Sequence, residues 1–173
     1  MKPYLALYLT ILATTHGMAA AGSPTASCNV NVDVIDTDPR GTNVRATPGG
    51  AIIASLTNPN AEGWVGVHVI GQVGDWYVID HARLINADLG PDGKTLFHGK
   101  GYLHKSVLGV SGMENNGAIY TDHDPRSRPL DLHAPGDQTV AMLGCWGEFL
   151  QVRVKKGIGW TDQACTNMDT TCS

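Results

Sequence analysis

The sequence contains little that would support membrane insertion, nucleic-acid binding or catalysis. Beyond its first residues the 173-residue chain has no second long apolar run, no run of like charges and no low-complexity tract. Its formal net charge is −4, so it lacks the basic surface that general nucleic-acid binding needs and that would attract it to anionic lipids. No catalytic signature stands out along the chain. These absences favour a soluble, non-enzymatic protein.

The first 21 residues have the pattern of a secretory signal peptide. A positive start at Lys2 precedes an apolar run from Leu5 to Thr15, and Ala19-Ala20-Ala21 offers small residues for cleavage. A membrane anchor is the alternative, but this run is shorter than the about 20 apolar residues that cross a bilayer. Cys28 lies too far beyond the cleavage site to carry a lipid. We therefore expect an exported protein, periplasmic or secreted and free of the membrane after cleavage; loss of Lys2 takes its net charge from −4 to −5.

The cysteines are even in number, which predicts two disulfides in an oxidising compartment. They are Cys28, Cys145, Cys165 and Cys172. Four cysteines allow three connectivities, and the sequence does not select one. A zinc site is the alternative, but no two cysteines have the C-x2-C spacing common in such sites. One disulfide contributes about 2–4 kcal/mol, which matters in a small domain.

The pattern of apolar and turn-forming residues predicts an all-β protein. Apolar residues alternate in two segments, as in strands with one buried face; the valines concerned are Val30, Val32, Val34, Val65, Val67 and Val69. A further apolar strand is expected over 51–56, between turns rich in glycine, proline and asparagine. No window of about a dozen residues has the apolar spacing of a helix. The strand spacing is that of a small barrel or sandwich.

One stretch of the chain occurs twice, and an internal repeat is the strongest guide to architecture. Residues 71–79 and 144–152 share the same order of a glycine, a tight turn, an aromatic residue and alternating apolar residues. The matched pairs, each 73 residues apart, are Gly71 with Gly144, Gly74 with Gly147, and Trp76 with Phe149. Each copy is predicted to be two strands joined by a tight turn.

The two copies differ in length after this hairpin. The first has 21 residues between Ile79 and Gly101, and the second has 6 between Val152 and Gly159. We expect the extra residues, at about 80–100, to form a hairpin insertion with its tip at Pro91-Asp92-Gly93-Lys94. Function is often added in such insertions. The expected boundaries are 28–110 for the first domain, 111–117 for a polar linker and 118–173 for the second domain with a disulfide-bearing tail.

Three motifs of the first repeat resemble bacterial SH3-like (SH3b) domains. They are Asn43-Val44-Arg45-Ala46 followed by Pro48, Gly74-Asp75-Trp76-Tyr77-Val78, and the closing run from Gly101-Tyr102 to Gly109. The second repeat matches them more loosely, at Ala118-Ile119-Tyr120, Phe149 and Gly159-Trp160-Thr161. The motifs occur in the same order twice, so the chain resembles the exported tandem type of this family.

The resemblance implies two small SH3-like β-barrels in tandem, the first with the insertion, and Trp76 and Phe149 filling the barrel centres. It also implies a non-catalytic module that recognises cell-wall material, namely a peptidoglycan peptide or glycan. The alternative is a module that binds another exported protein, such as an inhibitor or an immunity-type partner of a cell-wall enzyme. A hydrolase is the third hypothesis, but the chain lacks the Cys-bearing helix and His-bearing sheet of papain-like cell-wall hydrolases.

Exposed aromatic side chains are the best candidates for contact with a ligand. Two small cores do not need all three of the aromatic residues Trp64, Tyr102 and Trp146, and Trp146 lies at a turn. Packing between the two barrels is an equal alternative for them. Tyr120 lies in a segment similar to the start of eukaryotic SH3 domains, whose tyrosines line a polyproline-binding groove.

Several cysteine, histidine and aspartate residues have the types needed for catalysis or metal binding, but a structural role is favoured for each. Cys145 with His123 or His133 has the residue types of a nucleophile pair, but an even cysteine count favours a disulfide. The segment Asp122-His123-Asp124 with His133 suits a divalent metal, but a solvated loop is the favoured interpretation. His98 and His104 are interpreted as surface histidines. We predict no metal and no cofactor.

Overall fold

The computed structural model describes residues 25–58, 63–90, 93–113, 117–132 and 138–165. The predicted signal peptide (1–21), Pro91, Asp92, His133 and Cys172 lie outside these ranges. The described residues are all-β, as the sequence predicts, and every ladder between named strands is antiparallel. Two short 3-10 turns, η1 (Ala87–Leu89) and η2 (Lys105–Val107), interrupt the strands. Among the described residues no helix has the length and apolar character needed to cross a membrane.

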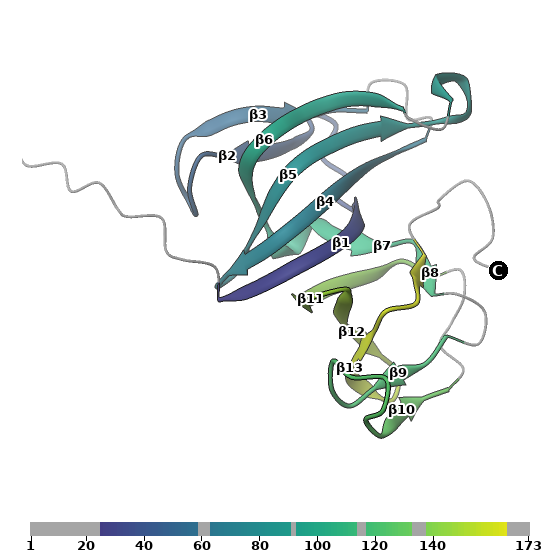
Figure 1. Ribbon diagram of the computed structural model, residues 1–173. Helices are drawn as coiled ribbons and strands as arrows, with labels where there is room; N and C mark the ends of the chain where they lie inside the picture. The colour runs from purple at the N-terminus through teal and green to yellow at the C-terminus, as the bar shows by residue number, and fades with distance from the viewer. Residues whose placement is uncertain (1–24, 59–62, 91–92, 114–116, 133–137, 166–173) are drawn as a thin grey trace, which may run out of the picture.

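The strands form two five-stranded units with the same internal order (Figure 1). The first unit has the order β3-β2-β6-β5-β4, from β2 (Thr42–Arg45), β3 (Ile52–Leu56), β4 (Trp64–Val73), β5 (Trp76–Ile85) and β6 (Lys94–His104). The second has the order β10-β9-β13-β12-β11, from β9 (Ile119–Tyr120), β10 (Pro129–Asp131), β11 (Val140–Trp146), β12 (Phe149–Val154) and β13 (Gly157–Thr161).

Two strands join the units into one continuous sheet. The strand β1 (Ala26–Val34) pairs with β4, and β7 (Leu108–Val110) pairs with both β1 and β11. The twelve-stranded order runs from β10 to β3 without returning on itself. The described strands therefore pair as one open sheet, whereas the sequence led us to expect two separate barrels. In addition, β8 (Gly112–Met113), inside the expected linker, pairs with β14 (Ala164–Cys165).

The repeated hairpins have the same register, as the 73-residue spacing predicts. In the first unit Val73 pairs with Trp76 across the turn Gly74-Asp75, and in the second Trp146 pairs with Phe149 across the turn at Gly147. Gly74 has φ 57° and Gly147 has φ 55°, a left-handed conformation that favours glycine at the first position of a two-residue hairpin turn. Both hairpins thus depend on the same local conformation.

The closing strand of each unit also meets the first strand in the same way. Tyr102 of β6 pairs with Arg45, and Trp160 of β13 pairs with Tyr120. Each closing strand has a glycine where the first strand approaches most closely. A Cβ at Gly101 would lie 2.3 Å from Val44 Cγ1, and one at Gly159 would lie 2.5 Å from Ile119 Cγ2. The matched closures show that the units repeat in space as well as in sequence.

The aromatic residues expected to fill the two cores lie partly exposed instead. Trp76 and Phe149 are half-buried, and the residues after them, Tyr77 and Leu150, are 0 % and 2 % exposed. Successive strand residues point to opposite faces. Trp76 and Phe149 therefore point away from the face on which Tyr77 and Leu150 are buried. The prediction for Trp76 and Phe149 was therefore wrong by one position.

The extra residues of the first repeat lengthen a hairpin. β5 and β6 stay paired from Trp76 with His104 as far as Leu84 with Lys94. Asn86 then begins the turn η1, and Gly90 and Gly93, with φ 72° and 61°, return the chain to β6. As a result, β5 and β6 have 10 and 11 residues, whereas the corresponding strands β12 and β13 have 6 and 5 (Figure 1).

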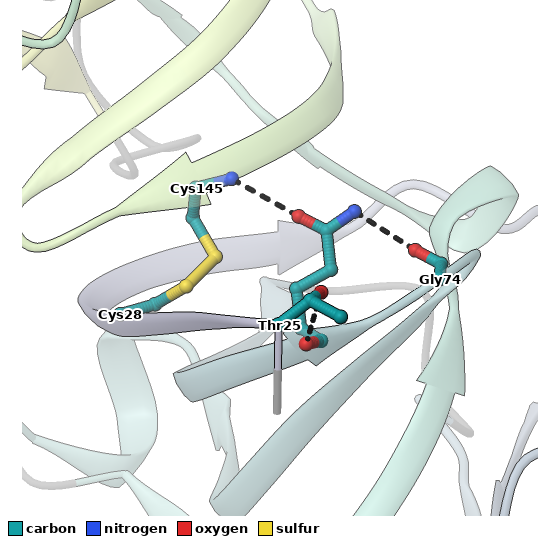
Figure 2. The surroundings of a disulfide bond; sticks show 5 residues. Thr25, Cys28, Gly74 and Cys145 are labelled. Atoms are coloured by element: carbon teal, nitrogen blue, oxygen red, sulfur yellow. Dashed lines mark hydrogen bonds between the residues drawn. A yellow bond between two sulfur atoms is a disulfide. The ribbon is translucent and has the colours of Figure 1, made fainter. Parts of the chain in front are cut away.

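A disulfide fastens β1 to the second unit (Figure 2). It joins Cys28 to Cys145, whose Cα atoms are 5.7 Å apart, so the prediction that Cys145 is half of a cystine is confirmed. Gly147 N–H also donates to Ser27 O at 2.8 Å, and Gln72 Oε1 accepts from Cys145 N–H at 3.4 Å. Cys165 carries no free thiol. The bridge and these bonds hold the repeated hairpins against each other.

Candidate binding surface

Aromatic rings gather on the outer face of the second unit. The His123 ring lies against two tryptophans, with its centroid 4.9 Å from that of Trp146 and 5.3 Å from that of Trp160. Trp146 is 50 % exposed and is the one aromatic residue among the large exposed hydrophobics of the described residues. Such rings present an apolar surface with polar N–H groups at its edge. We call these three residues the aromatic surface.

The sheet of the second unit positions the two tryptophans. Trp146 is the last residue of β11 before the hairpin turn, and Phe149 pairs with it across that turn. Trp160 pairs with Tyr120 of β9, and directly opposed residues on antiparallel strands share a face. The half-buried Tyr120 and Phe149 therefore flank the aromatic surface.

An ordered loop between β9 and β10 positions the histidine. Its ends are joined by a bond from Thr121 N–H to Arg128 O of 2.9 Å, which matches the bond from Ala46 N–H to Ala51 O in the first unit. The loop of the second unit is two residues longer and contains His123. Asp122 accepts hydrogen bonds from the backbone N–H of His123, at 2.8 Å, and from its Nδ1. The histidine is thus oriented before any ligand binds.

Charged groups line the edge of this loop. Hydrogen bonds from the backbone and side chain of His123 lower the pKa of Asp122, so its carboxylate stays ionised beside the aromatic surface. Arg126 donates two side-chain hydrogen bonds to Asp124, which lower the pKa of that carboxyl as well. The Asp122 side chain is 63 % exposed, so its carboxylate is accessible to a ligand.

The first unit does not repeat this surface. Trp146 is replaced by Val73, and Trp160 is replaced by Tyr102, which is only 1 % exposed. Lys100 Nζ lies 5.5 Å from the centre of the Tyr102 ring. The prediction of Tyr102 as an exposed ligand contact was therefore wrong, because this side chain is enclosed. Its hydroxyl has no hydrogen-bond partner among the described residues.

The remaining candidates from the sequence are distributed over both units. Tyr120 and Trp146 lie at the aromatic surface, whereas the half-buried Trp64 begins β4 of the first unit. Trp64 lines a hollow of about 180 Å³ together with His81 and Arg83. The structure therefore brings two of the four predicted residues together and leaves Trp64 apart from them.

The sequence offered His123 only as a metal ligand or as the partner of a nucleophile, and it did not single out Trp160 as a ligand contact. Trp160 was identified as the counterpart of Tyr102, but an alignment of the repeats does not show whether either side chain is exposed. The contact between His123 and the tryptophans depends on the course of the loop, which the sequence pattern does not define. Of the metal ligands considered in the sequence, Asp124 is paired with Arg126 and His133 lies outside the described residues.

Comparisons with protein-family models, with curated proteins and with solved structures give no match to this chain. The resemblance to bacterial SH3-like domains therefore rests on the sequence motifs.

Proposed function

We propose that this protein is an exported, non-catalytic binding module of two SH3-like units that recognises cell-wall peptidoglycan through the aromatic surface of its second unit. The observation that carries the proposal is the preordered cluster of the exposed Trp146 with the half-buried His123 and Trp160. The paired first and last strands of each unit agree with an SH3-like arrangement. The disulfide agrees with an oxidising compartment.

The chemistry of the aromatic surface suits a sugar ligand. Tryptophan rings offer flat apolar faces on which the C–H groups of a sugar ring pack. The Asp122 carboxylate accepts hydrogen bonds at the edge of those faces, and such bonds to a charged acceptor are stronger than neutral ones. Both types of contact are already in place, so little conformational entropy is lost on binding.

A second candidate function, binding of an exported protein partner, is favoured by a different observation. β3 forms one edge of the twelve-stranded sheet, and Ile52 and Ile53 on it are 53 % and 48 % exposed. An exposed apolar edge strand is the kind of element to which a partner adds a strand. On this alternative the protein is an inhibitor or an immunity-type partner of a cell-wall enzyme.

Co-sedimentation with purified, insoluble peptidoglycan tests the proposal. At low salt we expect the mature protein to pellet with peptidoglycan, and Trp146→Ala to remain in the supernatant. Ile52→Ala is the matched control, since it removes an equally exposed apolar side chain from the first unit. If the wild type stays in the supernatant, peptidoglycan is not its ligand. Release of soluble fragments by the protein would overturn the non-catalytic assignment.

A further inference from the structure

Two histidines and an aspartate converge on the outer face of the first unit. His68 of β4 and His81 of β5 both place Nδ1 against the same oxygen of Asp80, at 2.9 Å and 2.7 Å from Oδ1. Their ligand atoms all lie within 4.8 Å of one another, and the two imidazole rings stack with centroids 5.0 Å apart. Among the described residues this is the one group of three or more such side chains with this spacing.

A β-bulge explains how neighbours in sequence reach the same face. His68 pairs with His81 and Val69 pairs with Ile79, which leaves Asp80 as the extra residue on β5. The core positions of β5 accordingly shift from Tyr77 and Ile79 to Ala82 and Leu84. Asp80 and His81 both fall outside that set, on the outer face. Bulges of this kind are common beside functional sites, where they redirect a side chain.

The orientation of His68 is fixed by a second hydrogen bond. Its Nε2 lies 3.0 Å from Asn29 Oδ1 on β1, so Nε2–H donates to that amide oxygen. A histidine held in this way presents Nδ1 as its ligand atom. Metal-binding histidines almost always donate their other ring N–H to such a partner. The contact with Asn29 is therefore the feature that distinguishes this cluster from a chance ion pair.

A small widening of the cluster would admit an ion. Zinc lies about 2.0–2.2 Å from histidine nitrogen and carboxylate oxygen, which places neighbouring ligand atoms roughly 3.3 Å apart in a tetrahedral site. The observed separations between Nδ1 and Oδ1 of 2.7 and 2.9 Å would need to widen by roughly 0.5 Å. Small side-chain rotations achieve this, because His81 and Asp80 are 33 % and 43 % exposed.

The cluster also borders space for a further ligand. His81 lines a hollow of about 180 Å³ that extends over Gly66 and is bounded by Trp64 and Arg83. Three protein ligands and one open position are typical of zinc sites that bind a small molecule or water. A hollow of this size holds several waters, and its lining includes both Arg83 and the acidic residue Asp33.

From these observations we infer that His68, Asp80 and His81 form a binding site for a divalent transition-metal ion such as Zn²⁺, with Asn29 as the partner that orients His68. Imidazole and carboxylate ligands suit Zn²⁺ and its neighbours in the first transition series better than Ca²⁺ or Mg²⁺. On binding, the ion would replace the direct contacts between the two Nδ1 atoms and Asp80 Oδ1. The site lies in the first unit and does not depend on the proposed function of the aromatic surface.

Calorimetric titration of the disulfide-bonded protein with Zn²⁺ tests the inference. The protein must carry no histidine tag, since a tag would bind the ion itself. We expect one Zn²⁺ per chain for the wild type. His81→Gln and Asp80→Asn each remove a ligand and should weaken binding at least about 100-fold, while Asn29→Ala should weaken it about 10- to 100-fold through the orientation of His68.

His98→Gln is the matched control. His98 pairs with His81 in the sheet but lies outside the cluster and is exposed, so its loss should leave the affinity for Zn²⁺ unchanged. Circular dichroism identifies any variant that fails to fold, and the exposed position of Asp80 makes Asp80→Asn the safest comparison. The inference is overturned if the wild type does not bind Zn²⁺, or if folded Asp80→Asn and His98→Gln bind it equally.

Discussion

The buried carboxyl of Asp33, at the junction of the two units, predicts a measurable dependence of stability on pH. It lies on β1 opposite Gly66 of β4 and Gly109 of β7, at the junction between the units, and it is 1 % exposed. Ser111 Oγ–H donates to its Oδ2 at 2.5 Å, while Oδ1 has no partner among the described residues. Burial raises the pKa of Asp33 from 3.8 to about 7, and the hydrogen bonds from Ser111 offset only part of that effect.

The raised pKa means that folding favours the protonated carboxyl of Asp33. Below pH 3.8 the group is protonated in both states and costs nothing. Between pH 3.8 and about 7 the unfolded chain loses the proton while the folded chain keeps it, so stability falls as pH rises. Each tenfold difference in proton affinity is about 1.36 kcal/mol, so the full cost above pH 7 is about 4 kcal/mol.

Replacement of Asp33 by asparagine removes the buried charge and keeps an oxygen to accept from Ser111. We expect Asp33→Asn to match the wild type in stability near pH 4 and to exceed it by up to about 4 kcal/mol at pH 8. Urea unfolding of both proteins across this range measures the difference and cancels the titration of all other groups. A difference that does not change with pH, or a variant that is less stable at pH 8, would refute the assignment of a buried, raised-pKa carboxyl.

Two further predictions concern the disulfide and the closing strands. Replacement of Cys28 and Cys145 by alanine opens a loop spanning 117 residues and should lower the free energy of unfolding by about 3–5 kcal/mol; a loss below about 1 kcal/mol in urea unfolding would contradict the role given to the bridge. Gly159→Ala should cost about 1–3 kcal/mol by overpacking, because its Cβ would lie 2.5 Å from Ile119 Cγ2. Gly144→Ala is its control, since a Cβ there meets only ordinary contacts from 3.4 Å, and equal thermal stability of the two glycine variants would contradict the close approach.

The repeated hairpins could be predicted from the sequence because their information is local. A turn glycine, an aromatic residue and alternating apolar residues define each hairpin within nine positions. The structure gives both the same register and the same left-handed glycine. The one-position error at Trp76 and Phe149 arose because the motif shows that the aromatic residue is present but not to which face it points. That face is identified by the neighbouring residues that are buried, here Tyr77 and Leu150.

Features that depend on contacts distant in sequence were not predictable. β7 pairs with β11 of the second unit, and nothing in the local pattern of either strand indicates this partner. The cluster at His68 and Asp80 needs a bulge, which breaks the alternation by which strands are recognised. His123 meets Trp160 only because a loop two residues longer than its counterpart folds over the second unit.

The most direct test of the account is to observe the four tryptophan side chains separately while peptidoglycan fragments are added. The chain has four tryptophans, so its nitrogen-15 spectrum should contain four indole N–H signals that substitutions can assign. With soluble peptidoglycan fragments we expect the signals of Trp146 and Trp160 to shift in a saturable manner and those of Trp64 and Trp76 to stay in place. Saturable shifts confined to Trp64 or Trp76, or no shift of any signal, would contradict the assignment of the aromatic surface as the binding site.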